Sequence, residues 1–149
     1  MTKFKIGDDW WTTPTESENG NKIIVTGRRG VDSAMLSKKF NDRIEISWNY
    51  EPDSIGMPDF KTSVTMEKVT EAFLKTFKKE QVAIITGIYT GDSQRNWIFY
   101  CRNIQKFQVL INNALADFEL IPIDIYADKD PDWNEYKEMK ELTEINEGE

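Results

Sequence analysis

The chain has 149 residues, which fits one domain, and it carries 39% hydrophobic and 30% charged residues with a net charge of −7. It contains no histidine and a single cysteine, Cys101, which excludes Ser-His-Asp and Cys-His catalytic sites and intrachain disulfides. The amino terminus lacks the apolar segment of a signal peptide, and no apolar run is long enough to span a bilayer, so we expect a soluble cytoplasmic protein.

The negative charge is concentrated at the carboxyl end of the chain. Residues 129–149 contain three lysines and eight carboxylates, whereas the other 128 residues carry a net charge of only −2. Because an acidic surface repels the phosphate backbone, nucleic acid is a disfavoured partner. We expect one domain over residues 1–149, with an ordered core over about 8–143 and an acidic tail over 144–149.

Sequence patterns predict three strands in the first third of the chain: Trp10–Thr15, Ile23–Arg28 and Arg43–Tyr50. Asn19-Gly20 is a strong signal for a hairpin turn between the first two strands. Val31–Phe40 is expected to hold a short helical turn. Residues 51–62 contain two prolines and a glycine, which predicts a loop.

The middle of the chain predicts a helix followed by a hairpin. Apolar residues recur at helical spacing from about Met66 to Lys79, with Thr65 as the expected N-cap. Val82–Tyr89 and Asn96–Cys101 are expected to pair around a polar turn that contains Gly91 and Asp92.

The last third predicts a helix, a strand and a helix. Asn103 can cap the first helix. The strand Glu119–Tyr126 contains Pro122, which cannot donate a ladder hydrogen bond, so we expect this strand at a sheet edge. Asp130 is expected as the N-cap of a final helix over Pro131–Leu142, with proline at its first position.

The predicted order of elements defines a fold class. Strand, helix, strand, strand, helix, strand is the order of the ferredoxin-like βαββαβ arrangement, here with an extra amino-terminal hairpin and a carboxy-terminal helix. Two amphipathic helices would cover one face of an antiparallel α+β sheet. The second face would be open unless the hairpin extends the sheet or the last helix packs there.

Asp128-Lys-Asp-Pro-Asp132 is similar to the start of a calcium-binding loop. An EF-hand requires glycine at its sixth position and glutamate at its twelfth, but these positions hold Trp133 and Met139. Helix capping by Asp130 accounts for the cluster more simply. We therefore predict no metal site and no cofactor.

Gly27-Arg28-Arg29-Gly30 offers a possible anion site, because arginine binds carboxylates and phosphates in a forked geometry. The glycine spacing fits neither a phosphate-binding loop nor a dinucleotide fingerprint. The simpler interpretation is a glycine-flanked turn with two solvated arginines.

The second strand of the central hairpin occupies the place of the aromatic RNA-binding strand of RNA-recognition motifs. Arg95, Trp97 and Phe99 match that motif, but Asn96 and Ile98 do not. Aromatic side chains alternate onto both faces of this strand, which predicts a central strand covered on both sides. Candidates for the second cover are the tryptophans near the two chain ends, Trp10 and Trp11 or Trp133 together with Tyr136.

Several short motifs together resemble one family. They are Trp11-Thr-Thr-Pro-Thr, Glu18-Asn-Gly, Gly27-Arg28, Arg43-Ile-Glu-Ile-Ser-Trp, Thr86-Gly-Ile-Tyr-Thr-Gly-Asp, Arg95-Asn-Trp-Ile-Phe-Tyr and Asp130-Pro-Asp-Trp-Asn-Glu-Tyr. Over about residues 9–139 the chain resembles the DUF695 family of bacterial proteins of unknown function, a resemblance that brings no established activity and no catalytic residues to carry over.

A second resemblance rests on Asp130, Trp133 and Tyr136, which follow the last strand. They are similar to a segment of the regulators of ribonuclease E activity of type B. Those proteins are acidic and ferredoxin-like and act by binding another protein. This chain lacks their long acidic tail and has an added hairpin, so ribonuclease inhibition is an analogy only.

Three functional hypotheses follow. The first is a non-enzymatic, protein-binding or regulatory module that uses aromatic side chains, with Arg95 as a polar anchor; the aromatic residues are Trp97, Tyr100, Trp133 and Tyr136. The second is a small anionic-ligand site or carboxylate-based enzyme near Arg28, Asp92 and Arg95. The third is RNA binding. The oligomeric state is left open, because either sheet edge can pair with a second copy.

Overall fold

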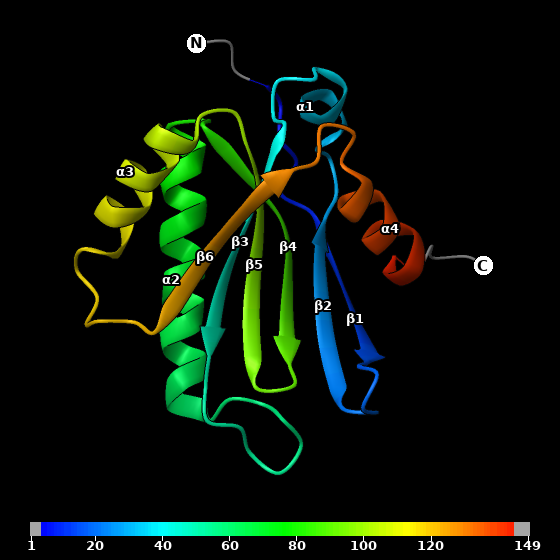
Figure 1. Ribbon diagram of the computed structural model, residues 1–149, viewed down its shortest axis with the longest axis vertical. Coiled ribbons are helices and arrows are strands. Elements are labelled where there is room, and N and C mark those ends of the chain that lie inside the picture. Colours follow the sequence, from blue (N-terminus) through cyan, green and yellow to red (C-terminus); the bar gives the residue numbers. More distant parts are fainter. Residues whose placement is uncertain (1–3, 145–149) are drawn as a thin grey trace.

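The computed structural model describes residues 4–144 and contains, within them, six strands and four helices (Figure 1). In chain order these elements are β1 (Trp10–Glu16), β2 (Lys22–Arg28), α1 (Asp32–Leu36), β3 (Asp42–Asn49), α2 (Phe60–Lys79), β4 (Ala83–Gly91), β5 (Gln94–Cys101), α3 (Ile104–Leu115), β6 (Ile123–Lys129) and α4 (Asn134–Thr143). The fold is therefore of the mixed α+β class. Within the described residues no helix is both long and apolar enough to cross a bilayer.

All six strands form one antiparallel sheet in the order β1-β2-β4-β5-β3-β6. β5 lies between β3 and β4 and is antiparallel to both, so β3 and β4 run parallel and are connected by α2. The amino-terminal hairpin adds to the outer side of β4. It therefore extends the sheet, which is one of the two arrangements that the sequence left open.

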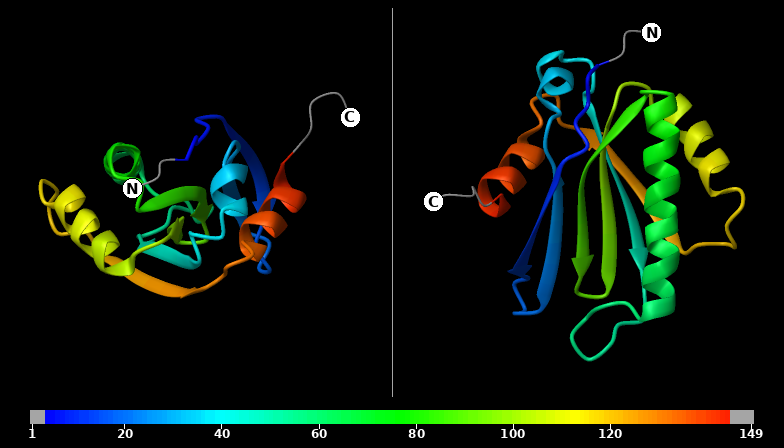
Figure 2. Two further views of the ribbon diagram at one scale, coloured as in Figure 1. Left: turned by 90° about the horizontal axis from the view of Figure 1, so that it is seen from above. Right: turned by 180° about the vertical axis from the view of Figure 1, so that it is seen from behind.

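The helices gather in two groups beside the sheet (Figure 2). Helices α2 and α3 lie side by side and bury one apolar cluster, whose central side chains include Trp97 and Phe99 of β5. Helix α4 contacts β1 and β2, and a second cluster there includes Ile98 and Tyr100 of the same strand. All five side chains from Trp97 to Cys101 are fully buried, which confirms the prediction of a central strand covered on both sides.

Two paired glycines determine how closely Trp11 and helix α4 approach the sheet. Gly27 of β2 lies opposite Gly87 of β4. A Cβ atom at Gly27 would lie 2.1 Å from the ring of Trp11, and one at Gly87 would lie 2.9 Å from the sulfur of Met139. The missing side chains leave a hollow that Trp11 fills from β1 and Met139 fills from α4. The Trp11 indole N–H also donates to Thr143 at 2.9 Å, which ties α4 to β1.

The first long helix begins earlier than its apolar stripe predicts. Helix α2 starts at Phe60, and its N-cap is Asp59, whose carboxylate accepts from the backbone N–H of Thr62 at 2.7 Å. The predicted cap, Thr65, lies inside the helix. The first turn was missed because its apolar residue, Phe60, is 85% exposed and does not belong to the stripe.

The last two elements are shifted toward the carboxyl end. Strand β6 starts at Ile123, just after Pro122, and it is an edge strand as predicted. Helix α4 starts at Asn134 rather than Pro131, because Trp133 adopts a left-handed conformation with φ 56°. The carboxylate of Asp130 nevertheless binds the start of the helix, accepting from the N–H groups of Asn134 and Glu135 at 2.9 and 3.1 Å.

The beginning of the predicted acidic tail is bound to the fold. Glu144 accepts from the guanidinium of Arg29 at 2.7 Å and lies 3.3 Å from the ammonium group of Lys140. Arg29 also contacts Asp9, so the pair links the two chain ends. The rest of that predicted tail, residues 145–149, lies outside the described residues.

Candidate functional site

Three of the four aromatic side chains proposed for partner binding lie together beneath α4. The ring of Tyr100 stacks on Trp133 at a centroid distance of 4.2 Å, and Trp133 meets Tyr136 edge-on at 5.7 Å. The fourth, Trp97, lies on the opposite face of β5 against Phe73 of α2. Each of the four is at most 1% exposed, so in this structure none of them offers a surface to a partner.

The polar atoms of these aromatic residues are already engaged inside the protein. The Tyr100 hydroxyl donates to Asp130 at 2.7 Å, and the Tyr136 hydroxyl donates to the carbonyl of Arg28 at 2.6 Å. The Trp133 indole N–H donates to the carbonyl of Phe40 at 2.8 Å. These side chains hold α4 on the sheet, which is a structural role.

The proposed anion site near Arg28, Asp92 and Arg95 is not assembled. Asp92 accepts from Asn21, which precedes β2, and it therefore lies at the opposite end of this strand from Arg28, roughly 20 Å away. Arg95 is bound to Thr90 at 2.9 Å and to Glu67 at 3.0 Å. Asp92 instead forms the hairpin turn with Ser93, where both residues have positive φ angles as in a type I′ turn.

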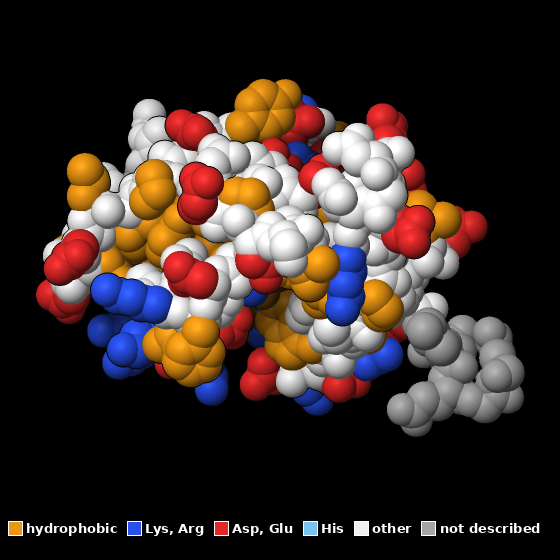
Figure 3. Space-filling model, turned by 90° about the horizontal axis from the view of Figure 1, so that it is seen from below, with side chains coloured by type: hydrophobic (Ala, Val, Ile, Leu, Met, Phe, Trp, Pro, Cys, Tyr) orange, Lys and Arg blue, Asp and Glu red, His pale blue; other side chains and the backbone are white. Residues whose placement is uncertain are grey.

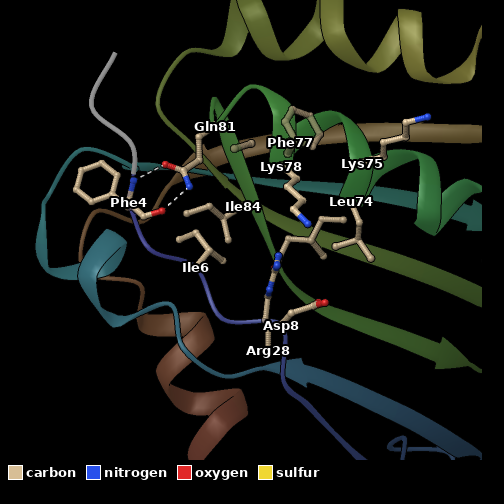
Figure 4. Close-up of a pocket in the computed structure, with 12 residues that line it drawn as sticks. Phe4, Ile6, Asp8, Arg28, Leu74, Lys75, Phe77, Lys78, Gln81 and Ile84 are labelled. Carbon is tan, nitrogen blue, oxygen red and sulfur yellow. Dashed lines mark hydrogen bonds between the residues drawn. The ribbon is translucent and has the colours of Figure 1, made fainter.

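Arg28 lines a pocket of about 600 Å³ that the sequence did not predict (Figure 4). Its walls come from residues 4–8, from the second half of α2 and from the beginning of β4. The apolar part of the lining consists of Phe4, Ile6, Leu74, Phe77, Ala83, Ile84 and Ile85. The charged part consists of Asp8, Arg28, Lys75 and Lys78.

Arg28 is held in place by several groups of the protein. Its Nε donates to the carbonyl of Gly7 at 2.8 Å, and a terminal nitrogen lies 3.4 Å from the carbonyl of Ile85. Its guanidinium carbon is 5.1 Å from the centre of the Trp10 ring. Burial lowers the pKa of Arg28, opposed by the charge of Asp8. Because an arginine stays protonated in proteins, the result is a partly buried and oriented positive charge.

Lys78 provides a second positive charge in this pocket. Figure 4 shows Arg28 and Lys78 extending into the same space from opposite walls, whereas Lys75 points away. Among residues 4–144, no ion pair involves either lysine. Among the described residues that line the pocket, Asp8 is the single carboxylate, so they carry excess positive charge in an otherwise acidic protein.

The amino-terminal segment forms one wall through an unusual clamp. The side-chain amide of Gln81 accepts from the backbone N–H of Phe4 at 2.6 Å and donates to its carbonyl at 2.7 Å. Gly7 bonds to Gly30 in addition, at 2.8 Å. The sequence did not single out Lys78 or Gln81 as site residues. A lysine in the last turn of a helix is expected from the helix dipole alone, so Lys78 carried no sign of a binding role.

A second group of titratable side chains lies beneath the start of α4. The Tyr89 hydroxyl donates to Glu135 at 2.5 Å, and Arg43 lies 3.6 Å from the other carboxylate oxygen. Burial raises the pKa of Glu135 most strongly, while the contacts with Tyr89 and Arg43 act in the opposite direction. The group joins α4 to β3 and β4, so we interpret it as structural.

The charge pattern of the surface bears on the RNA-binding alternative. On the face seen in Figure 3, acidic and basic side chains are interspersed with several small apolar groups. A protein that tracks a single strand needs a continuous basic groove lined with stacking aromatic residues. The mixed face shown there and the burial of Trp97 and Tyr100 give this alternative no support.

Comparison with known proteins identifies the family of this chain. A family model described as a family of unknown function, DUF695, matches residues 9–139, which is nearly the whole chain. No curated protein and no solved structure matched the chain. The likeness to regulators of ribonuclease E activity therefore stays a prediction from the sequence.

Proposed function

We propose that this chain, which belongs to the DUF695 family, is a non-enzymatic module that binds a small organic anion in the pocket beside Arg28. The observation that carries the proposal is the convergence of Arg28 and Lys78 on one space whose remaining walls are largely apolar. Two cations facing one space repel each other unless an anion lies between them.

The anionic group of the ligand is assigned to Arg28. A guanidinium presents five donors, and two of them are directed at the carbonyls of Gly7 and Ile85. The remaining donors can bind a carboxylate or a phosphate in the forked geometry that arginine favours. Lys78 supplies a flexible second charge, and Asp8 competes with the ligand for Arg28, which limits the affinity.

The rest of the ligand is assigned to the apolar lining. A volume of about 600 Å³ lies within the range of roughly 300–1,000 Å³ that is usual for small-molecule sites. Ile6, Leu74 and Phe77 provide a surface for a short hydrocarbon or aromatic body. The pocket therefore favours an amphipathic acid over a simple inorganic anion, because the latter leaves the apolar lining unused.

Thermal unfolding in the presence of matched probes tests this proposal. Octanoate and octyl phosphate are expected to raise the melting temperature, whereas octanol, which has the same tail without the charge, is expected to have little effect. Lys78→Gln should reduce the stabilisation. Lys79→Gln is the matched control, because this neighbouring lysine does not line the pocket. Equal stabilisation by octanol and octanoate would refute a charge-selective site.

We further infer that the segment from β3 to β6 is a ferredoxin-like βαββαβ unit. Its support is the strand order β4-β5-β3-β6 together with the connections through α2 and α3. A cytoplasmic location is supported by Cys101, which is unpaired and buried and so fits a reducing compartment.

A further inference from the structure

The two edges of the sheet differ in their capacity to accept another strand. At the β1 edge, the N–H of Arg29 donates to the carbonyl of Asp9, which fixes the hydrogen-bonding phase of the β1–β2 pair. In an antiparallel pair, every second residue directs its backbone N–H and C=O at the partner strand, and the residues between them direct theirs outward. Counting from Asp9, the backbone of Pro14 faces away from β2. Proline has no N–H, so the outer row of donors is interrupted in the middle of β1.

The β6 edge is not interrupted in this way. The N–H of Asp130 donates to the carbonyl of Asn41, and the register of β3 with β6 continues from this pair. The same alternation turns the N–H groups of Ile123, Ile125, Ala127 and Lys129 away from β3. The N–H of Ile123 donates to the carbonyl of Ile121 at 2.9 Å, so the donors that face another strand are those of Ile125, Ala127 and Lys129. At Pro122 the backbone faces the β3 side, so the N–H that proline lacks is not one of the outward donors. Strand β6 thus presents three successive outward donors, at Ile125, Ala127 and Lys129, with no proline among them.

We propose that β6 is the dimer interface of this protein, pairing antiparallel with β6 of a second copy about a twofold axis at Ile125. In this register Ile125 faces its own counterpart, and Ile123 faces Ala127 in both directions. These side chains share the sheet face of Ile44, Ile46 and Trp48, which line the core under α2 and α3. The interface therefore extends an existing apolar layer. The proposal of a dimer is independent of the pocket beside Arg28.

The charges on β6 favour this register over those with an axis at Asp124, Tyr126 or Ala127. An axis at Ile125 places Asp124 opposite Tyr126, where a carboxylate can accept from a phenol. An axis at Asp124 would place this residue opposite itself, and an axis at Tyr126 would place Asp124 opposite Asp128 on both sides. An axis at Ala127 would place Asp124 opposite Asp130. Like charges directly opposite one another destabilise a strand pair, so of these four registers only the first is free of this penalty.

The exposed fractions on β6 agree with such a contact. Ile125 is 49% exposed and Tyr126 is 58% exposed, although both lie within a regular strand. Pairing with a second copy would bury them and would satisfy the outer backbone groups of the strand. A long edge strand without this cover is a site of uncontrolled association.

Light scattering after size-exclusion chromatography tests the interface. The wild-type chain is expected at twice the monomer mass, and Ile125→Lys at the monomer mass, because it places two ammonium groups together at the axis. Val109→Lys is the control, since Val109 is similarly exposed, at 59%, but lies on α3. A monomeric wild type at every attainable concentration would overturn the proposal, and so would a dimer that Ile125→Lys leaves intact.

Disulfide trapping tests the register without relying on a destabilised variant. Facing hydrogen-bonded residues have Cα atoms about 5.5 Å apart, within the range that a disulfide spans. Ile125→Cys is therefore expected to form a covalent dimer under mild oxidation, whereas Asp124→Cys is not. A covalent dimer through position 124 in preference to 125 would contradict the proposed register.

Discussion

The indole of Trp11 occupies the space above Gly27, where any side chain on the neighbouring strand would collide with it at 2.1 Å. Gly27 lies directly opposite Trp11 in the β1–β2 pair. The ring is 5% exposed, and its N–H reaches Thr143 near the end of α4. This contact joins both ends of the chain to the sheet, and it explains why a glycine occupies a strand interior.

Gly27→Ala should therefore destabilise the protein by about 1–3 kcal/mol, the usual cost of overpacking a filled core. Gly87→Ala should cost less, because the added methyl meets the flexible end of Met139 instead of a ring. Urea unfolding followed by tryptophan fluorescence measures both. A larger loss in Gly87→Ala than in Gly27→Ala would contradict this account of the packing.

Glu135 should make the stability of the fold depend on pH. Its pKa is raised in the folded state, first by burial, whereas it returns to about 4.3 when unfolded. A carboxyl group with a raised folded pKa opposes folding while it is ionised. When the pH falls from above the raised folded pKa toward about 4.3, the free energy of unfolding should therefore increase.

The groups that face Glu135 are Tyr89 on β4, Arg43 on β3 and Asp130 before α4. Glu135→Gln should flatten the pH dependence in this window, because the substituted side chain does not titrate. Glu138→Gln, an exposed change three residues after Glu135 on the same helix, should leave the pH dependence unchanged. Chemical unfolding at several pH values decides between these outcomes, and an unaltered slope in Glu135→Gln would exclude this residue as the source.

Cys101 should be unreactive in the native protein. Burial raises the pKa of its thiol to about 12, so the thiolate is scarce at neutral pH, and the side chain is fully buried. A colorimetric thiol reagent should react with one thiol per chain in denaturant and with none on the same timescale in buffer. Rapid reaction in buffer would show that β5 is accessible.

Gln81 should control the order of the amino-terminal wall of the pocket. Gln81→Ala removes both hydrogen bonds to Phe4, so the amide of Phe4 should exchange with deuterium at least about tenfold faster, equivalent to about 1.4 kcal/mol. Gln105→Ala, an exposed change on α3, is the control. If exchange near Phe4 is equal in both variants, the clamp does not hold this segment.

The sequence predicted those elements whose side chains repeat with a regular period. Arg43–Tyr50 alternates cleanly, and β3 indeed buries Ile44, Ile46 and Trp48 on one face. The cover of β5 was also among the expected alternatives, because apolar side chains on both faces of this strand required a second cover. Trp133, one of the candidates, stacks on Tyr100. The start of α2 carried a usable signal in Asp59, but its exposed first turn breaks the apolar pattern.

The pocket could not be predicted, because its walls meet only in three dimensions. Phe4 and Gln81 are 77 residues apart, and no local pattern indicates that an amide side chain will bind the backbone at the other end of the chain. Arg28 was identified as an anion ligand from its type alone. Its predicted partner was Arg95, whereas the structure places Lys78 across from it. The spacing of charges along the chain does not encode this pairing.

Calorimetric titration of octanoate into the wild-type protein and into Arg28→Gln is the most direct test of the central claim, that the Arg28 pocket binds an amphipathic anion. A charged hydrogen bond contributes about 1.5–3 kcal/mol, so the affinity should fall about 10- to 100-fold in the variant. Circular dichroism should confirm that the variant is folded. Saturable binding to the wild type that is lost in folded Arg28→Gln is the predicted result, and absence of binding to the wild type, or equal affinity in both proteins, would contradict it.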